Sequence, residues 1–288
     1  MDEKKAALVL RNIDRMPSLS PTVGKILQVA NDPNSSANDL NKVISLDPVL
    51  AGKVLKLVNS AYFGFSEKMS STVRAIVVLG LNTIKNLALS TAALETISTA
   101  GATGLNMDEF WRHLLATGVY AKLVARKISV HKNFLEDYFL CGLMHDIGKI
   151  VLNNMNPVGY GKLIGAARAS GKPLHLYETA IFGINHAEIG KLLGGKWGLQ
   201  EQIVEAMALH HSPELVPEAN KKLVYSIIIA NNYVKKLEVG FSGSMYIENF
   251  SEDIWKATSI TEDQLGDLEG FLIEGVERAS IFLQSSSK

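Results

Sequence analysis

The segment GLMHDIGKIVL, Gly142 to Leu152, places a histidine and an aspartate side by side in an otherwise apolar stretch of helical character. Lys149 follows Asp146 three residues later. An ionisable group without a partner is costly to bury, so such groups pair, hydrogen-bond or bind a metal. The segment therefore predicts a buried polar network or a metal site within a helical core.

The composition limits the classes of function. Apolar residues make up 47% of the 288 residues, which is ample for a continuous core. The 29 basic and 29 acidic side chains cancel, so the chain has no net positive charge that would attract nucleic acid or an anionic membrane. We therefore expect no nucleic-acid partner. The single cysteine, Cys141, excludes an internal disulfide and fits a reducing compartment.

Two features argue against export and membrane insertion. The N-terminal run MDEKKAALVL carries acids among its first residues and only a short apolar stretch, a poor signal peptide. No apolar stretch approaches the roughly 20 residues needed to cross a bilayer. We therefore expect a cytoplasmic protein with no membrane association.

The dominant hydrophobic period is helical, which predicts an all-α fold. Several helix starts carry recognisable caps. Ser36 to Asp39 resembles a capping box, Asp47-Pro48 is typical of an N-cap followed by proline, and Asp108 is expected to cap a helix from Glu109 to about Ile128. A second capping box, Thr261 to Gln264, opens the last predicted helix, which ends near Leu283. The remaining predicted helices span 49–58, 72–79, 82–97, 134–152, 157–169, 186–197, 199–210 and 217–237, after a first one that begins near Pro21.

A few segments are not predicted to be helical. Met245 to Phe250 is the only weak strand candidate, and Gly240 to Ser244 is predicted to be a flexible loop. A boundary between two lobes is expected near residues 98–107.

The candidate metal ligands are spread over several predicted helices. Glu109 and His113 lie four residues apart and project from one helix face, His186 starts a helix, and His210-His211 end another. Imidazoles and carboxylates are ligands of Zn, Fe and Mn, and such ions activate water and neutralise charge on phosphate. Each residue also has a simpler interpretation: Glu109 as a first-turn acid, the histidines as polar residues at helix ends, and Lys149 as a solvated side chain. Taken together, the residues favour a metal site.

At this point the chain resembles the HD superfamily of metal-dependent phosphohydrolases. That family ligates metal through a first histidine, a His-Asp pair and a later aspartate, which match His113, His145, Asp146 and then Asn231 in YSIIIANNYVKKL. The last match is a substitution, because an amide stands where the family carries a carboxylate. An amide carbonyl can coordinate but carries no charge, so the site should be more positive and bind divalent metal less strongly.

The N-terminal half resembles the HDOD domain more specifically. The pattern is carried by DPVLAGKVLKLVNSAYF and AIVVLGL, and the resemblance covers most of residues 16–213. It implies a two-lobed helical bundle with an HD-type core, which residues 214–288 would complete as a C-terminal helical extension. It also implies a bacterial signalling output module. We expect its partners to be signalling proteins supplied in trans.

A third comparison adds ligands. The HD-GYP branch, which hydrolyses cyclic di-GMP, carries a glutamate, a separate histidine, a His-His pair and a lysine at positions that match Glu109, His186, His210, His211 and Lys149. Its Gly-Tyr-Pro element after the His-His pair is missing, since this chain reads SPELVPEA there, and Gly159-Tyr160-Gly161 lies elsewhere. Asp146 and Lys149 are the candidate catalytic residues, with Lys149 placed to hold a phosphate oxygen.

Three functions follow, in decreasing order of support. The first is a regulatory module whose HD-type pocket retains iron, manganese or zinc and binds a phosphorylated or nucleotide ligand or serves as a structural centre. The second is a metal-dependent phosphohydrolase that acts on a nucleotide or cyclic dinucleotide. The third is a metal-free scaffold in which the polar residues only hydrogen-bond.

Overall fold

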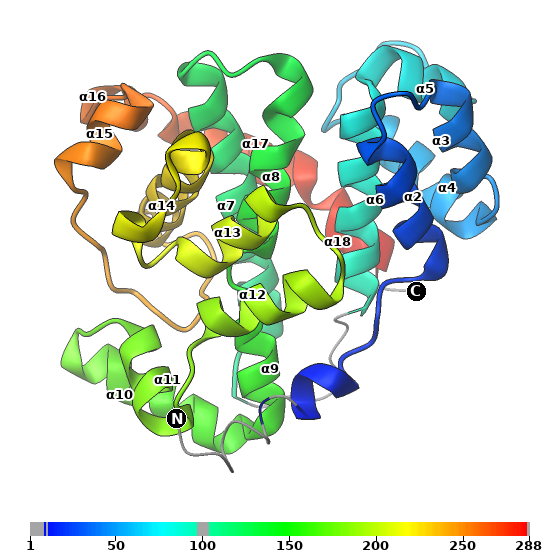
Figure 1. The fold of residues 1–288 in the computed structure, drawn as a ribbon. Helices are drawn as coiled ribbons and strands as arrows, with labels where there is room; N and C mark the ends of the chain where they lie inside the picture. Colours follow the sequence, from blue (N-terminus) through cyan, green and yellow to red (C-terminus); the bar gives the residue numbers. More distant parts are fainter. Residues whose placement is uncertain (1–8, 10, 97–103, 287–288) are drawn as a thin grey trace.

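The computed structural model describes residue 9 and residues 11–96 and 104–286. Every regular element in these ranges is a helix, which confirms the all-α prediction (Figure 1). Residues 245–250 are irregular, so the weak strand prediction for Met245 to Phe250 was wrong. Most of the predicted lobe boundary, residues 98–103, lies outside the described residues.

The first lobe is built from short helices that flank one long one. They are α2 (Pro21–Asn31), α3 (Ala37–Ile44), α4 (Pro48–Val58), α5 (Thr72–Leu79) and α6 (Leu81–Thr96). The capping box at Ser36 and Asp39 is confirmed, and the Asp47 carboxylate accepts the Leu50 N–H at 2.9 Å, as predicted for an N-cap. In the described part of the chain no single helix is long and apolar enough to cross a membrane. Helices α5 and α6 together would be, but the angle between them is 118°.

The second lobe surrounds the long helix α7 (Met107–Lys127), which packs against several of the others. After a 3-10 turn at Lys132–Phe134, the chain forms α8 (Leu135–Met144), α9 (Gly148–Met155), α10 (Pro157–Ser170), α11 (Leu174–Phe182), α12 (His186–Lys196), α13 (Glu201–Leu209) and, following two further 3-10 turns, α14 (Lys221–Lys236). Helices α8 and α14 pack on α7, and α9 and α13 pack on α12.

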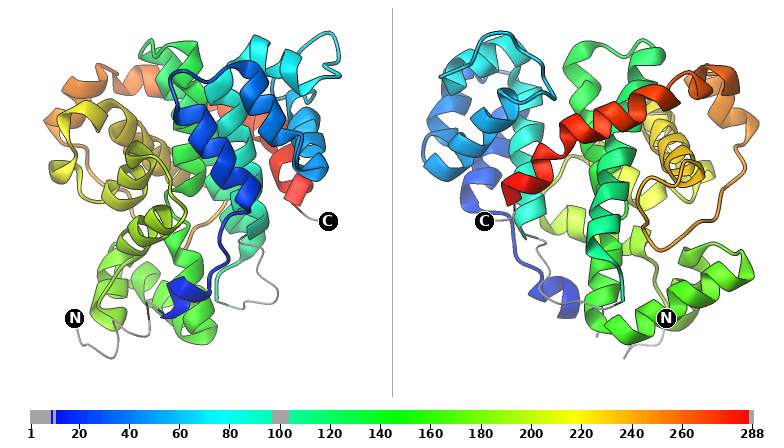
Figure 2. Two further views of the ribbon diagram at one scale, coloured as in Figure 1. Left: turned by 45° about the vertical axis from the view of Figure 1, so that its right-hand side comes forward. Right: turned by 180° about the vertical axis from the view of Figure 1, so that it is seen from behind.

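The C-terminal helices return to the first lobe. They are α15 (Glu252–Thr258), α16 (Glu262–Gly266), α17 (Glu269–Ala279) and α18 (Ile281–Ser286). Helix α17 packs on α7 and α18 packs on α4 and α6, so this segment runs across the back of the molecule from one lobe to the other (Figure 2). The predicted capping box at Thr261 is confirmed, but it opens only the short α16, and the single last helix of the prediction is three helices.

One predicted N-cap was wrong, and two helices were missed. The N-cap of α7 is Asn106, whose side chain accepts the N–H groups of Asp108 and Glu109 at 3.1 and 3.2 Å, so Asp108 lies in the first turn. Helices α11 and α15 were not predicted. Helix α11 begins directly after Pro173 with no side-chain cap, and α15 has none either, so neither offers the capping signal on which the prediction relied.

Candidate metal centre

The His-Asp pair lies in a turn between two buried helices. Helix α8 ends at Met144 and α9 begins at Gly148, so His145 and Asp146 are not inside one continuous helix, as the sequence suggested. Both side chains are fully buried. Gly148 permits this arrangement, because a Cβ atom there would overlap the His186 carbonyl at the start of α12. The close contact brings His186 next to the His-Asp turn.

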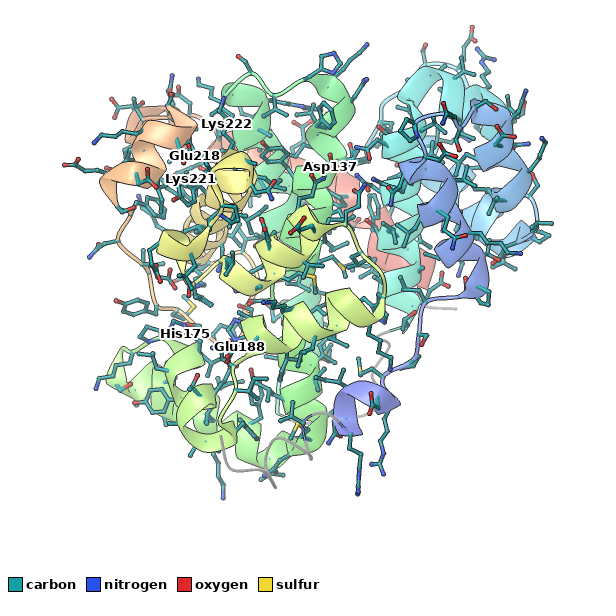
Figure 3. All side chains as sticks on the ribbon, viewed as in Figure 1. Asp137, His175, Glu188, Glu218, Lys221 and Lys222 are labelled. Carbon is teal, nitrogen blue, oxygen red and sulfur yellow. The ribbon has the colours of Figure 1, made fainter. Side chains whose placement is uncertain are left out.

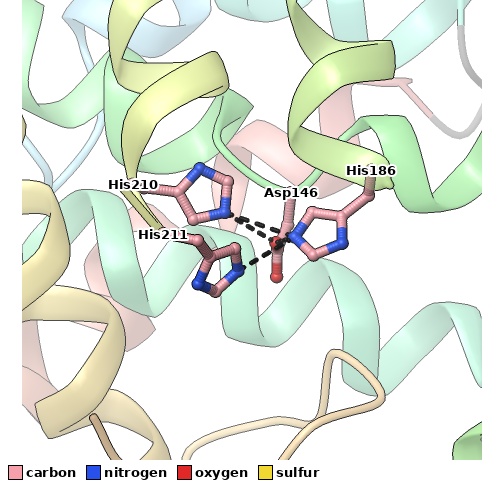
Figure 4. Close-up of side chains that lie close together, drawn as sticks. All are labelled: Asp146, His186, His210 and His211. Carbon is pink, nitrogen blue, oxygen red and sulfur yellow. Dashed lines mark hydrogen bonds and ion pairs between the residues drawn. The ribbon is translucent and has the colours of Figure 1, made fainter. Parts of the chain in front are cut away.

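The predicted histidines converge on Asp146 from separate elements. His186, His210 and His211 approach one side of its carboxylate, with His186 Nε2 at 3.1 Å and His210 Nε2 at 3.5 Å from Oδ1 (Figure 4). On the other side, His145 Nε2 lies 3.3 Å and His113 Nε2 3.8 Å from Oδ2. In each of these two groups the candidate donor atoms lie within 4.8 Å of one another, and Asp146 belongs to both.

The tautomers of four histidines are set by oxygen atoms next to Nδ1, the ring nitrogen that faces away from Asp146. Nδ1 of His145 lies 2.8 Å from the Gly142 carbonyl, and Nδ1 of His210 lies 2.9 Å from the Met207 carbonyl. Nδ1 of His186 lies 2.5 Å from Glu178, and Nδ1 of His211 lies 2.6 Å from Glu248. Because carbonyl and carboxylate oxygens only accept, each Nδ1 is the N–H donor and each Nε2 presents a lone pair toward Asp146.

The Nε2 atoms of His186, His210 and His211 lie close together. His186 Nε2 lies 3.3 Å from His210 Nε2 and 3.1 Å from His211 Nε2, and two lone pairs cannot hydrogen-bond to each other. Three buried side-chain atoms at this place have no hydrogen-bond partner in the described structure: His113 Nε2, His145 Nε2 and Asp146 Oδ1. Buried polar atoms are ordinarily satisfied, and these are all metal-ligand types. The residues present therefore fit a divalent transition metal.

The electrostatics of the centre follow from burial and from the carboxylates. Burial lowers the pKa of His113 well below its usual range and that of His210 to about 3, which keeps both imidazoles neutral and able to ligate. Burial opposes the charged form of Asp146 and His186 as well. However, His145 and Lys149 hold the pKa of Asp146 well below its usual range, and Glu178 raises the pKa of His186.

Lys149 is held inside the site. Its ammonium donates to Asp146 Oδ2 at 2.6 Å and to the Ser242 hydroxyl at 3.2 Å. Ser242 belongs to the segment 240–244, which was predicted to be a flexible loop. The segment is irregular but largely buried, and Gly240, at φ +74°, packs so closely on α7 that a Cβ atom would overlap the backbone of Glu109 and His113.

The sequence-predicted residues do not all meet at the centre. Glu109 uses its backbone carbonyl to accept the Phe241 N–H at 2.9 Å, and its carboxylate belongs to neither donor group. Asn231, on α14, is buried with its Oδ1 unpaired. Ligation of a metal by Glu109 and Asn231 stays a prediction.

Four functional candidates were missed by the sequence reasoning. Glu178 and Glu248 each hold a histidine Nδ1, and Glu178 also accepts the Tyr160 hydroxyl at 2.5 Å. His175, which is labelled in Figure 3, lies on α11. Its ring is tilted against that of His211, with ring centroids 4.3 Å apart. Lys235, on α14, is buried near the centre, and only this residue carried a sequence signal, because it follows Asn231 by one helical turn.

The family of the chain can now be stated. The family model described as the HDOD domain matches residues 16–213, and the chain belongs to this family. The predicted resemblance to the HDOD domain over residues 16–213 is thereby confirmed.

Several proteins are similar to this chain. An uncharacterised protein of Treponema pallidum (strain Nichols) is 29% identical over 82% of the chain, which spans 45% of the length of that protein. Among solved structures, an HDOD domain protein of unknown function from Geobacter sulfurreducens has a TM-score of 0.79 at 22% identity and covers 97% of this chain and 98% of its own. A putative phosphohydrolase from Shewanella amazonensis SB2B has a TM-score of 0.72 at 24% identity and covers 98% of each chain. At these identities the structural matches establish the shared fold.

Proposed function

We propose that this protein is a signalling output module of the HDOD family whose HD-type core holds a buried transition-metal centre, iron, manganese or zinc. The observation that carries the proposal is the approach of histidine Nε2 atoms to the Asp146 carboxylate from two sides, in two groups of candidate donor atoms that share Asp146. The residues that would hold the metal are Asp146, His186, His210 and His211 on one side and His113 and His145 on the other.

The burial of the centre favours a regulatory or structural role over turnover. When bound, such a metal polarises phosphoryl oxygens and lowers the pKa of water. A catalytic metal site keeps an open position for water and substrate. Here His113, His145, Asp146, His186 and His210 are each at most 1% exposed, and Lys149 is occupied by Asp146 and Ser242. The metal would therefore contribute mainly to holding α7, the α8–α9 turn, α12 and α13 together.

Hydrolysis is the second candidate function. It is favoured by the near-complete ligand set and by the fold shared with a putative phosphohydrolase. Against it stand Asn231 in place of a carboxylate and the missing Gly-Tyr-Pro element after His211. A partner among signalling proteins also belongs to the proposal, and a protein of the same fold from Marinobacter aquaeolei VT8 is described as a putative signal transduction protein.

One set of measurements tests both functions. Protein purified without chelators is analysed for metal and assayed against nucleotides and cyclic dinucleotides, as wild type, Asp146→Ala and Asn231→Asp. We expect metal in the wild type, loss of metal in Asp146→Ala and no turnover by the wild type. Wild-type turnover that Asp146→Ala abolishes would make the protein a hydrolase, and absence of metal after supplemented growth would contradict the metal centre.

A further inference from the structure

A cavity of about 130 Å³ lies between α7 and α17, where α17 crosses the back of the molecule (Figure 2). The buried Val119 and Lys122 of α7 line it, together with Gly275 of α17. A Cβ atom at Gly275 would come within 2.6 Å of the Val119 side chain, so the two helices pack directly against each other beside the cavity. Among the described residues, those that line the cavity are distinct from the candidate metal donors around Asp146, so this is a separate site.

Three cations line the cavity, and two of them pair with a carboxylate. Lys122 pairs with Glu136, and Arg278 pairs with Glu274. The third cation, Arg126, is exposed, and within the described residues no ion pair or hydrogen bond engages its guanidinium. The lining side chains and their ion-pair partners therefore carry one uncompensated positive charge. A monoanion would neutralise it.

One wall of the cavity carries an ammonium group in a fixed position. The Lys122 side chain is 8% exposed, and its ammonium donates to Glu136 and, at 2.9 Å, to the Tyr62 hydroxyl. An ammonium has three N–H groups, so one remains for a ligand. Tyr62 also lines the cavity and belongs to the turn after α4 in the first lobe. A ligand in the cavity would therefore contact the first lobe, α7 and α17 at once.

The remaining lining of the cavity is apolar. It comes from Val119, Leu123 and Phe271, and Phe271 is 58% exposed, so its ring offers apolar surface that a ligand would cover. An apolar cavity of about 150 Å³ binds a benzene molecule, so the volume here limits a ligand to a single ring or a short branched chain. Arg126 and Arg278 are exposed, which places the charged end of the ligand at the mouth of the cavity.

We propose that this cavity binds a small carboxylate with a single-ring or short branched aliphatic body, and that the bound ligand holds the two lobes together. The Arg126 guanidinium donates two parallel N–H groups to the carboxylate, and the body of the ligand packs against the apolar lining. A carboxylate fits better than a phosphate monoester, because it carries one charge at neutral pH and matches the single uncompensated cation. The site requires no metal and goes beyond the proposed function.

Two arginines of α7 provide the test. Arg126→Met removes the unpaired guanidinium, and Arg112→Met removes an exposed arginine of the same helix that does not line the cavity. Binding of benzoate, benzamide and acetate is measured by calorimetry and by thermal shift. We expect benzoate to bind the wild type, Arg126→Met to weaken it by about tenfold or more, and Arg112→Met to match the wild type. Absence of benzoate binding by the wild type, or equal affinity in the two variants, would overturn the proposal.

The other probes and a third variant test the shape and the place of the site. Benzamide lacks the charge and acetate lacks the ring, so both should bind more weakly than benzoate, and equal binding of either would refute the ligand class. Leu123→Phe reduces the cavity and keeps every charge, so it should weaken benzoate binding and leave metal content unchanged. Wild-type affinity in Leu123→Phe would place the ligand elsewhere. Benzoate binding that is lost when a chelator removes metal would place it at the metal centre, and either result overturns the proposal.

Discussion

At the scale of single residues, two carboxylates fix the imidazoles that face the centre. Glu178 contacts His186 through Nδ1 at 2.5 Å and also accepts the His186 backbone N–H at 3.0 Å. Glu248 holds His211 in the same manner. A carboxylate on the outer nitrogen sets the tautomer and raises the basicity of the ligating nitrogen. Neither glutamate belongs to the two groups of candidate donor atoms that contain Asp146, so both are positioning residues.

Glu178→Gln tests this role. The amide keeps the size of the side chain but loses the charge, so we expect metal affinity to fall about 10–100-fold in a competition titration with a coloured chelator. Tyr160→Phe is the control, since it removes one hydrogen bond to Glu178 and leaves the carboxylate beside His186. A folded Glu178→Gln protein with wild-type metal affinity would contradict the assignment.

The burial of Lys235 predicts a pH dependence of stability. Its pKa is about 8 in the folded chain and 10.5 for an unperturbed lysine, so between these values the unfolded state holds more protons than the folded state. Stability must then rise with pH across this window, and the destabilisation by Lys235 is fully present below it. In metal-free and phosphate-free buffer, the stability advantage of Lys235→Met over the wild type should shrink from pH 7 to pH 10. An advantage that stays constant would show that the charge is not the cause.

The residues of the site differ in how well the sequence predicts them. The sequence predicts six of them, because His113 follows Glu109 by one helical turn and the others stand next to one another or at helix ends: His113, His145, Asp146, His186, His210 and His211. Glu178 and Glu248 could not be predicted, because they reach the centre from α11 and from an irregular segment that only the tertiary fold brings near. The sequence therefore predicts the inner donors better than the residues that orient them.

At the scale of elements, caps explain which helix boundaries were predictable. Asp47 and Ser36 accept backbone N–H groups where the sequence indicated, because a short polar side chain before a proline or an apolar run has one favoured role. The turn at His145 and Asp146 was not predictable, because the apolar pattern continues through it from α8 into α9. Close contact between the backbones at Gly148 and His186 sets that turn. Such a contact does not change the spacing of apolar residues along the sequence, so the sequence pattern does not reveal it.

Asp47→Ala measures the contribution of one such cap. The substitution removes the acceptor of the Leu50 N–H and should lower the free energy of unfolding by about 0.5–2 kcal/mol in denaturant titrations. Metal content should not change, because Asp47 belongs to none of the donor groups near Asp146. Asp47→Asn keeps an acceptor and should lie close to the wild type. Loss of metal with unchanged stability would instead give Asp47 a role in the site.

At the scale of the whole molecule, an aromatic and ionic cluster joins the two lobes. Tyr62, from the turn after α4, contacts Phe139 of α8 and Phe282 of α18 with ring centroids 5.4 and 5.3 Å apart. Its hydroxyl lies 3.2 Å from Glu136, which also pairs with the buried Lys122 of α7. Lys122 further donates to the Tyr62 hydroxyl at 2.9 Å. The cluster connects the first lobe, the helix that carries His113 and the C-terminal helices, so we expect them to unfold together.

Phe282 is the residue that tests this coupling. Its ring is 1% exposed and lies 4.9 Å from Phe139, centroid to centroid, so Phe282→Ala should cost about 3–5 kcal/mol. Phe63 is the comparison. Its ring is only partly buried, so Phe63→Ala should cost less.

If the lobes form one cooperative unit, tryptophan fluorescence and far-ultraviolet circular dichroism will report the same shifted midpoint for Phe282→Ala. The fluorescence reports mainly on the second lobe and the C-terminal segment, which carry the three tryptophans Trp111, Trp197 and Trp255. The dichroism reports on all helices. Separate midpoints would mean that the lobes unfold independently.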